Sequence, residues 1–196
     1  KHCKFAFVTN ESYKKIAIER GGMKPEDVFV LRSGPKLERL KIQEPKNEIK
    51  RGKKFMVGYL GVIGQQEGIE YLLKAAKYIK ELPGRNDVFW GIVGGGPDVE
   101  HMKKLSHDMG LDDIVEFTGR VPDQTLLDYL NTADVCVNSD EYNAMNDKST
   151  MNKVLERKEE GFNYSSNNTH SQCAYIHCRE RRPERSVGDN AFYFTP

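Results

Sequence analysis

The sequence predicts an α/β fold with a doubly wound parallel sheet, and three observations support this prediction. From residue 54 to residue 156, apolar runs alternate with segments of helical periodicity. The runs are nearly continuous, which is typical of strands that helices cover on both faces. Glycines follow several of the runs directly, as they do in the turns that join strands to helices in such sheets.

The composition is that of a globular, somewhat polar protein without a marked charge. The 196 residues include 30 Lys and Arg against 29 Asp and Glu, so the net charge of +1 indicates no nucleic-acid partner. No window approaches the roughly 20 apolar residues that span a membrane. Cys136 stands inside one apolar run and Cys3 precedes another, which predicts reduced, buried thiols and a cytoplasmic protein.

Residues 1–35 read as one strand-helix-strand unit. KFAFVT (4–9) is the first predicted strand, Asn10 can cap a helix that ends at Gly21-Gly22, and Val28–Leu31 is the second strand. A unit of this size is too small to bury a core by itself. Since the chain also begins without Met, the sequence predicts a fragment whose first 35 residues end an N-terminal domain.

Residues 36–53 are charged, with few apolar side chains, and contain Pro45 and Gly52. This composition predicts a linker between two domains. The second domain is then expected to cover residues 54–196.

The second domain opens with the run Phe55–Val57, which leads into Gly58, Gly61 and Gly64. A helix is expected next, ended by Pro83-Gly84, because apolar residues recur at spacings of three and four. These residues are Ile69, Leu72, Leu73, Ala76 and Ile79. The following run, Val88–Val93, is a predicted strand that ends in Gly94-Gly95-Gly96.

The alternation continues to residue 156. A helix from an Asp98 cap to Gly110 and a helix from Pro122-Asp123 flank a predicted strand at 114–117. A fourth strand is expected at 133–138, and a fourth helix begins near Thr150.

Residues 157–185 are anomalous, because they have few apolar residues and no clear period, which predicts a loop or a disordered segment. It carries His170, Cys173, His177 and Cys178, which are possible zinc ligands, but their spacing matches no common zinc module and no metal site is expected. From Ser186 the amino-acid composition is again typical of folded protein.

The glycine turns are the first candidate site, because backbone N–H groups in such turns can bind phosphate. Gly58, Gly61 and Gly64 do not form a dinucleotide fingerprint, since the next strand does not end in an acidic residue, and no Walker lysine follows. The glycines can equally be tight turns without a ligand.

The second candidate is the predicted helix start after the fourth strand, at the carboxyl edge of the sheet. Lys148 and Lys153 could neutralise a diphosphate, and Glu156 could accept hydrogen bonds from ribose hydroxyls. Lys153 and Glu156 are three residues apart and so share a helix face, which also fits a surface ion pair.

The order of these motifs resembles that of a nucleotide-sugar-dependent glycosyltransferase of the GT-B fold, in family 4, glycosyl transferases group 1. The resemblance covers Thr9 to Glu156 and resumes at Ser186. The matching pieces are Val57-Gly-Tyr-Leu-Gly61 with Glu67-Gly68-Ile69, Ile92-Val-Gly-Gly-Gly-Pro97, Val115–Val121, Leu130–Asp134 and Asn152–Glu156.

The resemblance implies two Rossmann-like domains and transfer of a hexosyl group, with retention, from a UDP- or GDP-sugar to a hydroxyl of a glycan or lipid-linked acceptor. It places Gly61-Val62 at the diphosphate and the backbone of Arg120-Val121 at the base. Glu156 would bind the ribose and Lys153 the phosphates. It implies no cofactor and no metal, and a cytoplasmic protein that in its intact form can lie against a membrane.

Three departures qualify the resemblance. Leu60 and Glu67 stand where many members carry Arg or Lys, so Lys148 or Lys153 must supply the positive charge. Lys148 itself replaces a Glu that contacts the donor sugar in many members. Residues 157–185 resemble nothing in the family, which suggests a local disruption of the reading frame or a sequencing error. The fragment itself is expected to be inactive, because it lacks most of the acceptor domain.

Two other readings stay open at this point. An isolated Rossmann-like domain can hold a nucleotide without turnover. A nucleotide-sugar epimerase can also have the GT-B architecture.

Overall fold

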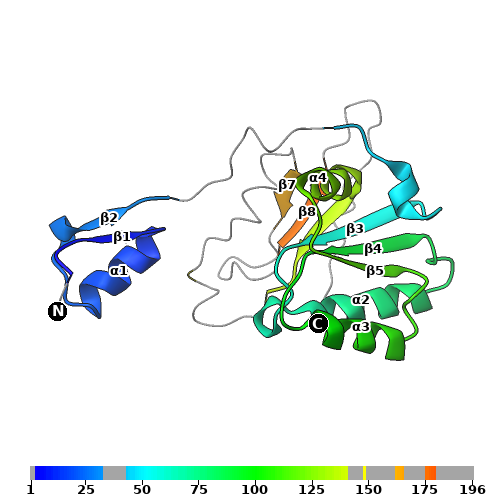
Figure 1. Ribbon diagram of the computed structural model, residues 1–196, viewed down its shortest axis with the longest axis horizontal. Coiled ribbons are helices and arrows are strands. Elements are labelled where there is room, and N and C mark those ends of the chain that lie inside the picture. The colour runs from blue at the N-terminus through cyan, green and yellow to red at the C-terminus, as the bar shows by residue number, and fades with distance from the viewer. Residues whose placement is uncertain (1–2, 33–42, 141–147, 149–161, 166–174, 180–196) are drawn as a thin grey trace.

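The computed structural model of the chain describes residues 3–32, 43–140, 148, 162–165 and 175–179. The strands of these residues form a two-stranded sheet, β1-β2, and a six-stranded sheet in the order β5-β4-β3-β6-β8-β7 (Figure 1). Among the described residues, none of the helices has the length and the apolar content that crossing a membrane requires.

The N-terminal unit has the predicted strand-helix-strand order. Strands β1 (Ala6–Val8) and β2 (Val28–Val30) are parallel, and α1 (Glu11–Glu19) connects them. The Asn10 side chain accepts a hydrogen bond from the Tyr13 N–H at 2.9 Å, which confirms the predicted cap. Cys3 is exposed, so the prediction of a buried thiol at this position is wrong, whereas Cys136 is buried as expected.

The larger sheet confirms the doubly wound fold. Its parallel part consists of β3 (Phe55–Leu60), β4 (Val88–Val93), β5 (Val115–Gly119) and β6 (Val135–Asn138). The helices of this part are α2 (Ile69–Glu81), α3 (Val99–Asp108) and α4 (Asp123–Thr132). Figure 1 shows α2 and α3 together on one face of the sheet and α4 on the other.

The two faces of β4 pack in two separate apolar clusters. Trp90 and Ile92 belong to the cluster that contains Leu72 and Leu73 of α2. Phe89 and Val93 point the opposite way, into the cluster that contains Leu130 of α4. Because successive strand residues alternate between faces, a strand covered on both sides has no polar positions, which explains the unbroken run at 88–93.

Gly58 lies inside β3, so the prediction that the strand gives way to a turn at this residue is wrong. A Cβ at position 58 would stand 3.0 Å from the Ala133 Cβ and 3.6 Å from the Cys136 sulfur. Gly58 therefore allows the residues that lead into β6 to pack closely on β3, and the turn begins only at Gly61.

The described part of the predicted linker, residues 43–53, is held against the end of α4. The Gln43 N–H donates to Asn131 Oδ1 at 3.0 Å, and the Lys46 N–H donates to Thr132 Oγ1 at 2.9 Å. Lys50, in a short 3₁₀ helix (Asn47–Lys50), is buried and forms an ion pair with Asp134 at 2.8 Å. These contacts attach the segment to the second domain, and the boundary between the domains stays a prediction.

Two strands lie within residues 157–185, so the prediction of a loop is wrong for these parts of the segment. Strand β8 (Tyr175–Arg179) pairs antiparallel with β6, and β7 (Phe162–Ser165) pairs antiparallel with β8. These strands are held by backbone hydrogen bonds to the edge of β6, and such bonds require no hydrophobic period in the sequence. The helix expected near Thr150 and the segment from Ser186 lie outside the described residues.

Candidate functional site

The strand order places a switch point between β3 and β6. The chain runs outward from β3 to β4 and β5, and then crosses back so that β6 pairs with the other side of β3. In open parallel sheets, ligands bind outside the carboxyl ends of the strands at such a point. The candidate site is therefore formed by the turns after β3, β4, β5 and β6.

The turns after β3 and β4 are joined through their backbones. The Gly61 N–H donates to the Val93 carbonyl at 3.0 Å, and the Ile63 N–H donates to the Gly95 carbonyl at 3.1 Å. At Gly94, where φ is +139°, a Cβ would stand 1.8 Å from the Gly61 carbonyl oxygen. Only glycine fits there, and the contact fixes the two turns relative to each other.

The N–H groups of the β3 turn alternate between paired and unpaired. Within the described residues, the N–H groups of Val62 and Gly64 have no hydrogen-bond acceptor, whereas those of Gly61 and Ile63 do. Val62 is 58% exposed, and a Cβ at Gly64 would meet nothing within 4 Å. Open N–H groups in a turn at the carboxyl edge of a sheet form a concavity that suits an anion.

Tyr59 anchors this turn to the apolar core. Its ring is buried in the apolar core, and its hydroxyl donates to the Val62 carbonyl at 2.7 Å. Glu67 Oε2 lies 3.3 Å from the same hydroxyl. This hydrogen bond holds the Val62 carbonyl toward the core. The side chain of the same residue is exposed, and its N–H has no acceptor among the described residues.

The residues after β6 are locked to the segment between the β3 turn and α2. Ser139 Oγ donates to the Glu67 carbonyl at 2.8 Å. At Gly68, where φ is +63°, a Cβ would stand 1.9 Å from the Ser139 carbonyl oxygen. This contact spans the switch point, because Ser139 follows β6 while Glu67 and Gly68 follow β3.

Asn138 and Asp140 are polar residues of the site that the sequence reasoning did not single out. Both are buried, and Asn138 Nδ2 donates to Asp140 Oδ2 at 2.8 Å. The signal that could have found them is a polar pair directly after an apolar strand, at the carboxyl edge of the sheet.

Arg120 and Val121, predicted near the base, follow β5. Where β4 pairs with β5, Ile92 lies opposite Phe117 and Val93 lies opposite Gly119. Thr118 of β5 is therefore an extra residue that forms a bulge. The Val121 side chain packs against the cluster under α4, which leaves its backbone as the part that can meet a ligand. The Arg120 side chain is exposed and runs along Gly95, where an added Cβ would stand 2.8 Å from the Arg120 Cγ.

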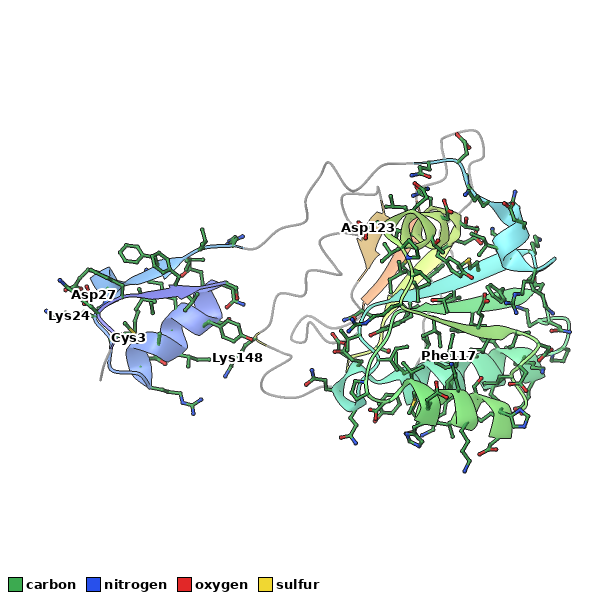
Figure 2. The ribbon with its side chains drawn as sticks, viewed as in Figure 1. Cys3, Lys24, Asp27, Phe117, Asp123 and Lys148 are labelled. Atoms are coloured by element: carbon green, nitrogen blue, oxygen red, sulfur yellow. The ribbon has the colours of Figure 1, made fainter. Side chains whose placement is uncertain are left out.

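The other predicted residues are only partly placed. Lys148 is exposed, and its carbonyl accepts a hydrogen bond from Asn10 Nδ2 at 2.9 Å, beside the start of α1 (Figure 2). Lys153 and Glu156 lie outside the described residues. No group of His, Cys, Asp and Glu among the described side chains could hold a metal ion.

The strand order and the helices on both faces define a doubly wound α/β domain. A family model, glycosyl transferases group 1, matches residues 41–145, which is more than half of the chain. The chain belongs to this family. A search of the curated proteins returned no match.

Solved structures of the GT-B glycosyltransferases share the fold. HepE from Anabaena, solved in complex with UDP-glucose, is 16% identical with a TM-score of 0.63; the match covers 81% of this chain and 43% of HepE. A glycosyltransferase from Rickettsia africae has a TM-score of 0.63 at 12% identity, over 81% of this chain and 42% of its own. TarM from S. aureus, solved with UDP, has a TM-score of 0.59 at 16% identity, over 81% and 28%. The chain thus spans less than half the length of these relatives.

Proposed function

We propose that this chain forms the donor-binding part of a glycosyltransferase that moves a hexosyl group from a UDP- or GDP-sugar to an acceptor hydroxyl. The observation that carries the proposal is the open pair of N–H groups at Val62 and Gly64, in a turn of a domain that belongs to this family. The complexes of HepE with UDP-glucose and of TarM with UDP support a uridine nucleotide as the first donor to test.

The proposed roles follow the positions of the residues. The diphosphate lies against the Gly61-Val62 turn, and the backbone of Arg120-Val121 meets the base. Lys148 and Lys153 contribute positive charge, and Glu156 accepts hydrogen bonds from the ribose hydroxyls. The acceptor is a glycan or a lipid-linked hydroxyl, and residues 1–35 belong to the domain that meets it, joined to the donor domain by residues 36–53.

The proposed chemistry depends on the leaving group. The bond between the anomeric carbon and the diphosphate oxygen breaks, and the acceptor oxygen forms a bond on the same face of the sugar while its proton passes to the departing diphosphate. Backbone N–H groups fixed at the developing negative charge lower the barrier, because they need no reorganisation during the reaction. No metal or cofactor is required, so we expect a chelator to leave nucleotide binding unchanged.

Calorimetric titration of the whole 196-residue chain with UDP and with GDP tests the proposal. We expect at least one of them to bind, and uridine to bind more weakly because it lacks the diphosphate that the turn holds. If folded protein gives no heat above buffer with either nucleotide, the donor site is wrong. If uridine and UDP bind equally, the assignment of the turn to the diphosphate is wrong.

A further inference from the structure

The turn that is proposed to hold the diphosphate has no cation of its own. Leu60 is buried at the end of β3, and Glu67 brings a carboxylate close to the turn through its contact with the Tyr59 hydroxyl. A diphosphate is strongly anionic, and N–H groups alone balance its charge only in part. A positive side chain next to the turns is therefore needed.

Arg120 lies where such a charge can act. It follows Gly119, and the Gly94 N–H donates to the Gly119 carbonyl at 3.1 Å, so the β5 turn sits directly against the β4 turn. The Cγ, Cδ and Nε atoms of Arg120 all lie within 3.5 Å of the place that a Gly95 Cβ would occupy. The stem of Arg120 thus lies along Gly95, whose carbonyl accepts from the N–H of Ile63 in the donor turn.

The guanidinium of Arg120 is not committed to another charge. Arg51 pairs with Glu116, and Lys46 and Lys50 pair with Asp128 and Asp134. Arg120, in contrast, makes no ion pair within the described part of the chain, and its side chain is exposed. An Arg without a carboxylate partner keeps its five donors available for phosphate oxygens.

We propose that the Arg120 side chain binds the diphosphate of the nucleotide donor, and that Gly95 is glycine so that this side chain can lie across the β4 turn. The inference rests on the proposed donor site and adds a role to Arg120 that its backbone contact with the base does not include. Arg120 then adds a positive charge at the donor turn itself, beside the charge proposed for Lys148 and Lys153, and so helps to compensate for Leu60 and Glu67.

Three variants of the whole chain test this inference by calorimetry with UDP, UMP and uridine. Arg120→Gln removes the charge and keeps a side chain of similar reach. Arg120→Lys keeps the charge but loses the fork of donors. Gly95→Ala keeps Arg120 and displaces its stem, since the new Cβ would stand 2.8 Å from a flexible side-chain atom.

We expect Arg120→Gln to weaken UDP binding by about tenfold, which is the lower end of the range for a hydrogen bond to a charged group. Uridine binding should stay within about twofold, because uridine carries no phosphate. UMP should lose less than UDP, Arg120→Lys should fall between wild type and Arg120→Gln, and Gly95→Ala should weaken UDP while sparing uridine. The salt dependence of UDP binding should also decrease in Arg120→Gln.

Three outcomes overturn the inference in different ways. If the wild-type chain binds UDP and Arg120→Gln binds it equally well, Arg120 does not bind the diphosphate, while the donor site stands. If Arg120→Gln weakens UDP and uridine by the same factor, Arg120 acts on the base or on the turn itself. If wild-type protein binds neither UDP nor GDP, the donor site and this inference fall together.

Discussion

Gly64 and Gly94 occupy turns at the same edge of the sheet and meet different surroundings. Gly94 has φ of +139° and lies against the Gly61 carbonyl, so both its backbone conformation and its packing exclude a side chain. Gly64 has φ of −139°, an extended conformation that any residue adopts, and open space where a Cβ would be. Glycine at position 64 is thus not required by the fold, and a ligand that approaches the backbone is a reason to have it.

The two glycines should respond differently to the same substitution. Gly94→Ala should lower the free energy of unfolding by about 1–3 kcal/mol or more, because it combines backbone strain with a clash. Gly64→Ala should change it by less than about 0.5 kcal/mol and should weaken UDP binding. Urea unfolding and calorimetry on both variants check this. Equal loss of stability in the two variants would contradict the distinction.

The Tyr59 hydroxyl offers a second test at this scale. Tyr59→Phe keeps the buried ring and removes the donor to the Val62 carbonyl, which should cost about 1 kcal/mol of stability. Because the carbonyl then loses its anchor, UDP binding should weaken more than uridine binding. The control is Tyr78→Phe on the exposed side of α2, where Tyr78 is 59% exposed. If UDP binds to Tyr59→Phe as it does to wild type, Tyr59 does not position the turn.

The site residues show how far single positions can be predicted from the sequence. The turn at Gly61 and Val62 was predicted because a glycine turn after a strand has one place in a parallel sheet, and its contact with a diphosphate stays a prediction. Asn138 and Asp140 were not found, because a polar pair after a strand also describes an ordinary loop, and only burial separates the two cases. The place of the Arg120 side chain along Gly95 was not predicted, because it depends on a contact between two strand ends.

At the scale of elements, α4 is tied to the sheet by a polar network beside its apolar face. The Tyr129 hydroxyl donates to Glu116 Oε2 at 2.7 Å, and Glu116 also pairs with Arg51. Arg51 lies over the Phe89 ring at 5.4 Å from its centroid. The network connects the start of β3, the strand β5 and the helix α4, so it fixes where α4 crosses the sheet.

The protein should become less stable at alkaline pH because of Tyr129. Burial and the neighbouring Glu116 raise the pKa of Tyr129 above its ordinary value. Above about pH 10 the unfolded chain releases this proton while the folded chain keeps it, so the free energy of unfolding falls as the pH rises. Urea unfolding at pH 8.5, 10 and 11 should show a shallower decline for Tyr129→Phe than for wild type. Parallel declines would mean that Tyr129 titrates normally in the folded protein.

The three described helices of the second domain, α2, α3 and α4, were predicted closely, and some of the strands less so. Helix α2 follows from the spacing of its apolar residues and from Pro83-Gly84, which are local signals. The end of β3 was misplaced because a glycine after an apolar run was interpreted as the start of a turn. The close contact with Ala133 is instead what explains glycine at position 58. The contacts of residues 43–53 with α4 were not predicted, because they involve backbone N–H groups and charged side chains, which carry no apolar pattern.

At the scale of the whole molecule, β6 is not the edge of the sheet. Strand β8 pairs with it over four residue pairs. At one end Val135 lies opposite Cys178, and at the other end Asn138 lies opposite Tyr175. An unpaired strand edge exposes a row of N–H and C=O groups, so this pairing covers the edge of β6 and leaves β5 and β7 as the outer strands of the sheet. The overall architecture was predictable from the alternation of elements, but this antiparallel addition was not, since its residues lack an apolar period.

Hydrogen exchange should report this pairing. Strand β8 lies between β6 and β7, so the amides of Tyr175–Arg179 that donate to either neighbour should exchange more slowly than those of the exposed turn at Val62 and Gly64. Mass spectrometry of peptides from the two regions measures the difference. A substitution Ile176→Pro, which removes one N–H from a central strand, should remove the protection across β8. Exchange in β8 as fast as in the turn would contradict the observed sheet.

The bulge at Thr118 makes the number of residues in this stretch as important as their identity. One residue more or less between Phe117 and Arg120 would change the register in which Gly119 pairs with Val93, and it would displace Arg120, which follows the strand, from its place along Gly95. A relative could therefore keep every residue of the site and still lose its geometry through a single deletion. Tolerance at this position should be broad for substitution and narrow for changes in length, so a comparison of relatives is informative here only if gaps are counted as strictly as residues.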